Sequence, residues 1–278
     1  MKTIGFIDFS LDEWHANNYP EWIKNAAKKY GADVKLSYAW AEKDSESGLS
    51  TNEWCEKFAV TECKSIEELC EKSDYVVILS PSNPEKHLEY AKKALKFGKR
   101  TYIDKTFAPS YAEAKEIFDI AKKYNAEIFS SSALRYASEL EGVKNAKNVI
   151  ITGGGRSVNE YIIHQIEQLT VLFGPGAESV KASKQGEQSI FSVSYNDGKK
   201  ATLIFSPVLP FTLCHDGEES GYTPITSAYF DGLIYDIVRF FETGEHNPTR
   251  EETLEIMKIR DAALKAEAIP GKTVLTNN

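Results

Sequence analysis

Strand-like and helix-like segments alternate over the first 130 residues, and this alternation is the strongest constraint on the fold. Strand patterns fall at residues 2–9, 32–41, 75–80, 100–103 and 127–130, with helical patterns at 20–29, 85–97 and 111–124. The strands are continuously apolar, as in YVVILS at 75–80. Continuous apolar strands linked by helices are typical of a parallel sheet covered by helices on both faces. We therefore predict a Rossmann-like, doubly wound α/β domain over residues 1–130.

The pattern changes in the second half of the chain. A strand at 148–152 is followed by three glycines, Gly153 to Gly155, and by a helix over 161–172. Strands with alternating polarity follow at 179–183, 190–195 and 200–206, and the last two are joined by Asn196-Asp197-Gly198, a strong hairpin signal. Two helices end the chain, one before Gly244 and one over 249–268. We predict a second domain over residues 131–278, of α+β type with a mainly antiparallel sheet.

Composition and charge exclude several classes of function. The 278 residues carry 33 basic and 41 acidic side chains, a net charge of −8, without a basic run to bind nucleic acid. No apolar run approaches the roughly 18 residues that span a bilayer, and the first residues form a strand pattern rather than a signal peptide. Four cysteines without a CxxC pair indicate reduced thiols and no metal site. We expect a cytoplasmic protein with no membrane or nucleic-acid partner.

Two separated motifs carry a family resemblance. Residues 87–108 read HLEYAKKALKFGKRTYIDKTFA, with Asp104-Lys105-Thr106 near the end, and the triple glycine is followed by Glu160-x-x-x-His164. The first motif resembles H-x-E-x-A-x-x-A-L-x-x-G-K with a later E-K-P, and the second resembles Asp-x-Gly-x-His. Both patterns, in this order, are those of the Gfo/Idh/MocA oxidoreductases, the family of glucose-fructose oxidoreductase and inositol 2-dehydrogenase.

The resemblance implies a nucleotide-binding domain, a substrate domain and an active site in the cleft between them. It implies hydride transfer between NAD or NADP and a sugar, inositol or related polyol. Lys105 would be the active-site lysine, His164 the acid/base, and Glu160 would replace the accompanying aspartate. A histidine near neutrality suits removal of a hydroxyl proton, and an ammonium group favours the developing alkoxide. Alternatively, His164 is a core or surface histidine and Glu160 simply starts its helix.

Three further residues are candidate substrate ligands. Arg135 and Tyr136 stand where the family often carries an Arg-Arg-Phe-like run after the last Rossmann strand. His15 lies in WHANNY at 14–19, a run rich in groups that bind hydroxyls or stack on sugar rings. Arg135 is equally explained as a surface residue, and the run at 14–19 as an aromatic helix start that packs on its own domain.

The glycines that bind phosphate are missing after the first strand. A dinucleotide fold has G-x-G-x-x-G there, whereas this chain has DFSLDE at residues 8–13. A carboxylate about 4 Å from a phosphate opposes binding by roughly 4 kcal/mol at an effective dielectric of about 20. A bound dinucleotide would need other groups near the strand ends. The candidate cofactor-binding residues are Asp8, Ser10, Ser80, Pro81, Asn83 and Asp104, beside Lys105.

The sequence leaves two classes of function open. The first is an NAD(P)-dependent oxidoreductase acting on a sugar, inositol or related polyol, which the retained Lys105 and His164 favour. The second is a non-redox sugar-binding or regulatory member that has lost the dinucleotide, which Asp8, Ser10 and Glu13 favour.

A homo-oligomer, either a dimer or a tetramer, is also expected. The strand at 190–195 turns Phe191, Val193 and Tyr195 one way and Ser192 and Ser194 the other. An antiparallel sheet often has one face to be solvated or buried by a partner, and the family resemblance favours the second outcome.

Overall fold

The computed structural model describes residues 1–277, which form two compact units. The first unit contains Met1–Ser131 and Leu233–Thr249, and the second contains Ser132–Gly232 and the chain from Arg250 onward. From the sequence we assign all of 131–278 to one domain, whereas the structure groups Leu233–Thr249 with the first unit. The division of the chain into a nucleotide-binding and a substrate domain stays a prediction.

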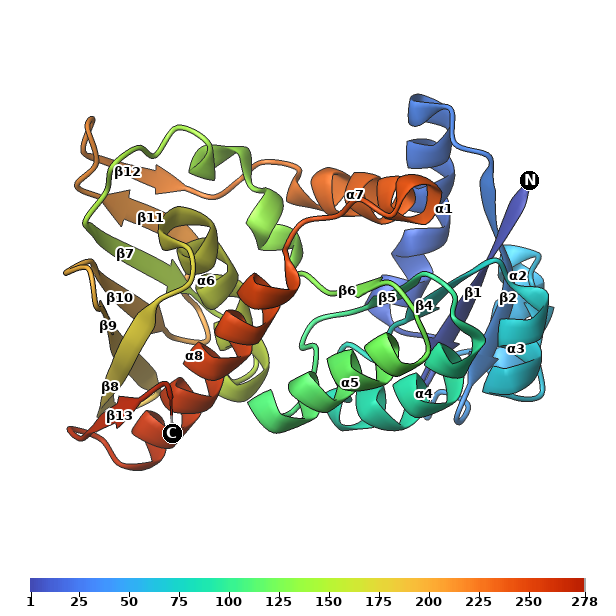
Figure 1. Ribbon diagram of the computed structural model, residues 1–278, viewed down its shortest axis with the longest axis horizontal. Helices are drawn as coiled ribbons and strands as arrows, with labels where there is room; N and C mark the ends of the chain where they lie inside the picture. Colours follow the sequence, from blue (N-terminus) through green and yellow to red (C-terminus); the bar gives the residue numbers. More distant parts are fainter. Residues whose placement is uncertain (278) are drawn as a thin grey trace. The chain divides into compact units, whose positions relative to one another are not determined.

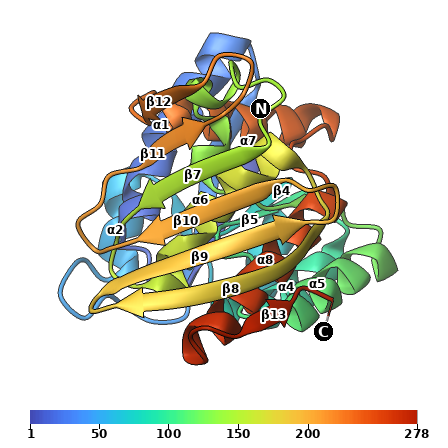
Figure 2. The same cartoon turned by 90° about the vertical axis from the view of Figure 1, so that its left-hand side faces the viewer.

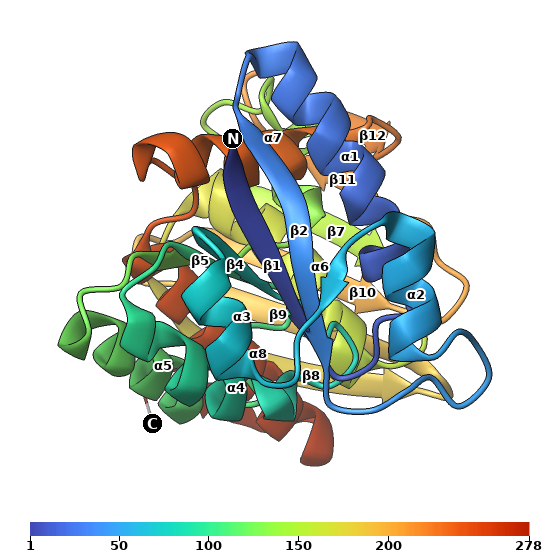
Figure 3. The ribbon, with the colours of Figure 1, turned by 90° about the vertical axis from the view of Figure 1, so that its right-hand side faces the viewer.

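The first unit is built on a six-stranded parallel sheet, which confirms the predicted Rossmann-like architecture (Figures 1 and 3). The strand order is β3-β2-β1-β4-β5-β6. Its strands are β1 (Lys2–Asp8), β2 (Val34–Ala41), β3 (Thr61–Glu62), β4 (Tyr75–Ile78), β5 (Thr101–Ile103) and β6 (Ile128–Phe129). The order reverses between β1 and β4, and α/β sheets bind ligands beyond the carboxyl ends of the strands at such a point.

Helices cover both faces of this sheet, as its continuous apolar strands require (Figure 3). They are α1 (Trp14–Tyr30), α2 (Thr51–Phe58), α3 (Ile66–Lys72), α4 (His87–Ala94), α5 (Tyr111–Lys123) and most of α7 (Tyr229–Thr243), with short 3₁₀ turns at Pro84–Lys86 and Leu95–Phe97. From α7, Phe240 packs on Phe129 with ring centroids 4.9 Å apart, and Phe241 stacks on Tyr75 at 4.8 Å. These aromatic contacts explain why a segment so late in the chain joins the first unit.

Two helices differ from the sequence-based prediction. The helix expected to begin at Pro20 begins at Trp14, because the Glu13 side chain caps it, and Pro20 lies inside the helix. The helix α2 was not among the predicted helices, and it is opened by a reciprocal capping box between Ser50 and Glu53.

The second unit contains a seven-stranded sheet in the order β12-β11-β7-β10-β9-β8-β13 (Figure 2). Its strands are β7 (Asn148–Gly153), β8 (Ala177–Gln185), β9 (Gln188–Tyr195), β10 (Lys200–Phe205), β11 (Thr212–His215), β12 (Gly221–Pro224) and β13 (Thr273–Leu275). Only β7 and β10 pair in parallel, so the predicted mainly antiparallel sheet is confirmed. Strands β11, β12 and β13 were not predicted, because they are short and carry few apolar residues.

Two helices, α6 (Val158–Phe173) and α8 (Arg250–Ala268), lie behind the sheet in Figure 2. Phe191, Val193 and Tyr195 of β9 are buried, whereas Ser192 on the other side is exposed. Two 3₁₀ turns, Ala133–Tyr136 and Ser138–Leu140, precede β7. Within residues 1–277, no helix is long and apolar enough to cross a membrane.

The triple glycine after β7 is explained by close backbone packing. A Cβ atom on Gly154 would lie 2.5 Å from the Ser206 carbonyl oxygen and 2.7 Å from that of Leu209. Gly155 adopts a φ of +148°, a conformation that side chains other than glycine rarely adopt. The glycines therefore let the β7–α6 turn lie directly against the segment that follows β10.

Replacing Gly154 should destabilise the second unit. Gly154→Ala places a methyl group against backbone that cannot rotate away, and overpacking of this kind costs about 1–3 kcal/mol. Gly142→Ala is the matched control, because nothing lies within 4 Å of its added Cβ. Denaturant unfolding should show a lower midpoint for the Gly154 variant alone. Equal midpoints for both variants would contradict the proposed packing role.

Candidate functional site

Several predicted site residues meet at the carboxyl ends of the strands in the first unit. Asp8 ends β1, Ser80 follows β4, and Asp104 and Lys105 follow β5. The Oδ1 atom of Asp8 accepts hydrogen bonds from the Ser80 amide at 3.0 Å and the Phe9 amide at 2.7 Å. Ser80 has a φ of +54°, which is uncommon for a residue with a side chain. Its hydrogen bonds to Asp8 hold it there and join the ends of β1 and β4.

Asp8 is a buried carboxyl group that resists ionisation. Burial raises its pKa well above the ordinary value, and the nearby Glu13 charge raises it further, against the opposing effect of backbone amides. Its Oδ2 atom is buried and has no hydrogen-bond partner. The repulsion between Asp8 and a phosphate is therefore weaker than the sequence alone suggests.

The first amides of α1 are occupied by the chain itself. The Glu13 carboxylate accepts hydrogen bonds from the His15 amide at 2.8 Å and from the Ala16 amide. A Rossmann fold presents such helix N-terminal amides to the pyrophosphate of its dinucleotide. With Glu13 on these donors, the β1–α1 turn does not fit a pyrophosphate.

A buried histidine–carboxylate pair lies beside the turn. His15 Nδ1 is 2.5 Å from Asp104 Oδ2, and the Tyr102 hydroxyl lies 3.0 Å from both Asp104 Oδ1 and the Ser131 carbonyl oxygen. Burial alone would raise the pKa of Asp104, but its contact with His15, helped by Lys105, lowers it instead. The pair can therefore keep a carboxylate within the protein and orient the imidazole ring.

Lys105 is partly exposed next to this pair, and its Nζ donates to the Pro81 carbonyl oxygen at 3.3 Å. His87 supports the same loop, because its ring nitrogens contact the Leu79 carbonyl oxygen at 2.6 Å and that of Phe107 at 3.1 Å. Burial lowers the pKa of His87, although two carbonyl partners favour its protonated form. From the sequence, His87 was only a motif match, and its role in fixing the segment after Lys105 was not predicted.

Ser10 and Asn83 are two other predicted cofactor ligands. Ser10 is half-buried, and its amide is among those that hold Asp8. The Asn83 side-chain amide donates to the Glu85 carboxylate at 2.9 Å, near the surface of the loop. As cofactor ligands, both stay predictions.

In the second unit, His164 lies on α6 and is half-buried. The Ser132 hydroxyl is 2.6 Å from its Nδ1 atom, and the rings of Tyr161 and Phe211 pack edge-on at 5.5 and 5.8 Å. Glu160 lies in the first turn of α6 and forms an ion pair with Arg156. The ring of His164 is thus oriented by a hydroxyl group, whereas Glu160 lies at the start of a helix and is paired with Arg156.

Arg135 is buried beside two carboxylate groups. Its Nη2 donates to Glu252 at 2.7 Å, its Nε lies 3.4 Å from Glu167, and its side chain is 2% exposed. Burial raises the pKa of Glu167 to about 7, although Arg135 and the Ser132 amide oppose the shift. Tyr136 is half-buried in the same 3₁₀ turn. Roles of Arg135 and Tyr136 in substrate binding stay predictions, and the guanidinium of Arg135 already has two carboxylate neighbours.

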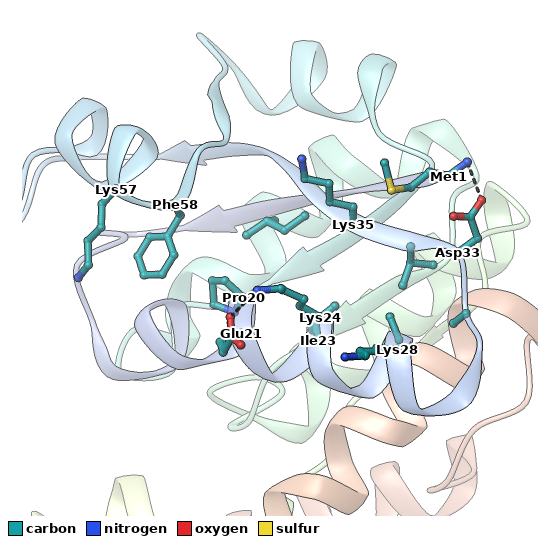
Figure 4. Close-up of a pocket in the computed structure, with 14 residues that line it drawn as sticks. Met1, Pro20, Glu21, Ile23, Lys24, Lys28, Asp33, Lys35, Lys57 and Phe58 are labelled. Atoms are coloured by element: carbon teal, nitrogen blue, oxygen red, sulfur yellow. Dashed lines mark hydrogen bonds and ion pairs between the residues drawn. The ribbon is translucent and has the colours of Figure 1, made fainter.

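A groove of about 580 Å³ lies elsewhere in the first unit, along α1, β2 and the end of α2 (Figure 4). Apolar side chains, including Ile23, Leu36 and Phe58, form part of its lining, and Lys28 and Lys35 add positive charge. None of the predicted site residues lines it. Within residues 1–277, no group of three or more His, Cys, Asp or Glu side chains could hold a metal ion.

Residues 24–132 match the model of the Gfo/Idh/MocA family, described as an oxidoreductase family with an NAD-binding Rossmann fold. This match confirms, for that segment, the family resemblance predicted from the sequence. It includes Asp104 and Lys105, and it begins after the β1–α1 turn.

Two curated relatives match parts of the chain. The Escherichia coli oxidoreductase YhhX is 37% identical over 57 residues, which are 20% of this chain and 16% of that protein. An oxidoreductase of Streptococcus pneumoniae is 27% identical over 135 residues, which are 48% of this chain and 33% of that protein. The chain therefore aligns with a third or less of the length of each.

Solved structures match the fold over nearly the whole chain. A "probable dehydrogenase" of Thermotoga maritima has a TM-score of 0.79 at 16% identity, covering 99% of both chains. An Agrobacterium radiobacter oxidoreductase in complex with NAD+, L-tartaric acid and magnesium has a TM-score of 0.80 at 11% identity, covering 99% of this chain and 98% of that one. The UDP-N-acetylglucosamine 3-dehydrogenase of Acidithiobacillus ferrooxidans scores 0.73 at 15% identity, covering 97% of both. At these identities the likeness shows a shared fold.

Glu167 should make the protein less stable as the pH rises. A carboxyl group whose pKa is raised from 4.5 to about 7 contributes stability that is fully present below the unfolded value and is lost as the pH passes through the folded value. Glu167→Gln keeps an acceptor for the Ser132 amide, so from about pH 5 to pH 8 its unfolding free energy should fall less than that of the parent, by roughly 3 kcal/mol at most. Glu178→Gln, at an exposed position, is the control. Parallel stability curves for parent and Glu167 variant would contradict the assignment.

Proposed function

We propose that the protein is an NAD(P)-dependent oxidoreductase that transfers a hydride between the nicotinamide and a sugar, inositol or related polyol. The observation that carries the proposal is Lys105, which follows strand β5 inside the segment matched by the family model. A cationic side chain at the carboxyl edge of a Rossmann sheet is placed where this fold binds its ligands. The sugar nucleotide named for one structural neighbour, a dehydrogenase, supports a hydroxylated substrate.

The two candidate catalytic side chains have different tasks in this proposal. Lys105 stabilises negative charge on the reacting oxygen through its ammonium group. His164 accepts the hydroxyl proton or returns it, and its contact with the Ser132 hydroxyl fixes the orientation of the ring. Glu160 plays a positioning role at most, because its carboxylate is paired with Arg156.

The dinucleotide would have to be held without the β1–α1 turn. Ser80, Pro81 and Asn83 in the loop after β4, together with Lys105, are the groups available for it at this edge. When bound, NAD or NADP supplies or accepts the hydride. The occupation of the α1 amides by Glu13 favours a second candidate, a non-redox sugar-binding or regulatory protein with the same fold.

Titration with NADH and NADPH, followed by tryptophan fluorescence, tests the first candidate. We expect weak binding, in the millimolar range, that Lys105→Ala weakens further and Lys115→Ala, an exposed lysine on α5, leaves unchanged. With a substrate in hand, His164→Ala should lower kcat by about 10² to 10⁴. If Lys105 and His164 act in the same step, kcat of the double variant should fall by less than the product of the fold losses of the two single variants. Absence of binding by both dinucleotides would favour the non-redox candidate.

We further propose that the protein forms a homo-oligomer through the open face of the seven-stranded sheet. This face, turned toward the viewer in Figure 2, lies opposite α6 and α8. Ile150 of β7 is 42% exposed on it, and its strand neighbours across the sheet include Cys214 and Thr202. Tyr222 of β12, paired with Cys214, is 66% exposed. Apolar side chains gathered on one exposed face are typical of an interface between protein chains.

Light scattering at micromolar concentration should give a mass of at least twice the chain mass of 31.1 kDa. Ile150→Lys should shift the population toward the monomer, because a charge would be buried without a partner. Val171→Lys is the control, since Val171 is 37% exposed on α6, on the helical side. A parent protein of monomer mass would refute the proposed assembly.

A further inference from the structure

The groove along α1, β2 and the end of α2 is a second candidate ligand site (Figure 4). We propose that it binds an amphipathic anion of the fatty-acid type, with an unbranched apolar chain and one carboxylate. The groove borders Val34 and Leu36 at the start of β2, whereas the proposed redox site lies beyond the carboxyl ends of the strands. The inference therefore goes beyond the proposed function and does not depend on it.

A short neighbouring strand leaves this part of the sheet open. Strand β3 is two residues long and pairs with Tyr38 and Ala39 of β2. Within residues 1–277, no strand therefore lies on the outer edge of β2 at residues 34–36, which line the groove. Helix α1 lines it from Pro20 to Lys28, a length of about 12 Å at a rise of about 1.5 Å per residue. The volume of about 580 Å³ lies within the range of roughly 300–1,000 Å³ that is typical of small-molecule sites.

The floor of the groove is apolar. Ile23, Val34 and Leu36 contribute to it, with side chains that are almost fully buried. Phe58 is half-buried at one end, and its ring packs on Trp54 with centroids 4.5 Å apart. An alkyl chain laid along these groups leaves water, which is favourable. A sugar would instead place hydroxyl groups against apolar surface without hydrogen-bond partners.

Lysines surround this apolar floor, although the whole chain has a net charge of −8. The lysines that line the groove are Lys24, Lys28, Lys35 and Lys57. Lys24 pairs with Glu21, with Nζ and Oε2 3.3 Å apart. The other three lysines form no ion pair with any residue that the structure describes. Ammonium groups without a counterion around one groove favour a ligand with negative charge.

The two acidic residues of the groove offer little opposition to an anion. Glu21 is paired with Lys24, and the Asp33 carboxylate lies 2.7 Å from the amino group of Met1. A neighbouring cation therefore offsets the charge of each carboxylate. A cationic ligand would instead meet the lysines, so the charges favour an anion over a cation of the same shape.

The unpaired lysines come from three different elements. Lys28 is in the last turn of α1, Lys57 is in the last turn of α2, and Lys35 is on β2. A lysine in a last turn also interacts favourably with the helix dipole. That effect acts on each helix separately, and it does not explain why the three side chains line one apolar groove. A matched control therefore needs lysines that are also in last turns but lie outside the groove.

Titration of the ¹⁵N-labelled parent protein with octanoate, followed by backbone amide NMR, tests the proposal. We expect the amides of Lys35, Leu36 and Phe58 to shift at millimolar concentration. Octylammonium has the same chain with the opposite charge, acetate has the charge without the chain, and tetraglutamate has several charges without an apolar body. Each should bind about tenfold more weakly than octanoate, or less. No shift of these amides by octanoate, or equal binding of any of the other three probes, would overturn the proposal.

A double charge reversal tests the role of the lysines. Lys28→Glu/Lys57→Glu should weaken octanoate binding about tenfold or more, because two attractions become repulsions. Lys96→Glu/Lys122→Glu is the control, because it changes the net charge equally at exposed last-turn lysines of the first unit that do not line the groove. Equal weakening in both double variants would refute the role of the lysines. The parent titration does not depend on a variant that folds.

Light scattering distinguishes a small ligand from a second copy of the chain in the groove. We expect Lys28→Glu/Lys57→Glu to leave the mass of the parent protein unchanged. A changed mass would assign the groove to an interface between chains and would overturn the proposal. None of these measurements involves a dinucleotide, so failure of NADH binding would reject the proposed redox function alone.

Discussion

The buried carboxyl group of Asp8 is the interaction on which the ligand-binding edge of the first unit depends. Through one oxygen it holds the Phe9 and Ser80 amides, so it joins the ends of β1 and β4 at the point where the strand order reverses. Glycines do this work in a dinucleotide fold by letting the backbone turn tightly around a phosphate. Here the Asp8 side chain accepts hydrogen bonds from the backbone amides of Phe9 and Ser80, so these amides need no negative ligand as acceptor.

The lack of a phosphate-binding glycine turn also determines how α1 begins. Without a phosphate on its first amides, the helix needs another acceptor, because N-terminal amides have no partner within the helix. Glu13 provides it and thereby moves the helix start to Trp14, well before Pro20. This earlier start places His15 on the first turn, where it meets Asp104 from the end of β5. The His15–Asp104 pair thus lies at the start of the helix whose preceding turn has no glycine fingerprint.

The architecture was largely predictable from the sequence, because continuous apolar strands and helical segments alternate at short range. The sequence also contained a local signal for α2, which was not predicted, because Ser50 and Glu53 form a capping box within four residues. Contacts between distant residues were not predictable. His15 and Asp104 are separated by 89 positions, and Phe240 and Phe241 of α7 find Phe129 and Tyr75 only in the folded chain. Neither pairing leaves a periodic pattern in the sequence.

His164 and His15, the two histidines predicted as site residues from the sequence, are held by different kinds of neighbouring group. His164 is oriented by the neutral hydroxyl of Ser132. His15 is oriented by the buried carboxylate of Asp104, and this contact lowers the pKa of Asp104. His87 is held between two backbone carbonyl oxygens, and burial lowers its pKa, although the charge of Asp104 opposes the shift. His15 and His87, both in the first unit, are therefore held by different groups: a side-chain carboxylate holds the first and two backbone carbonyl oxygens hold the second.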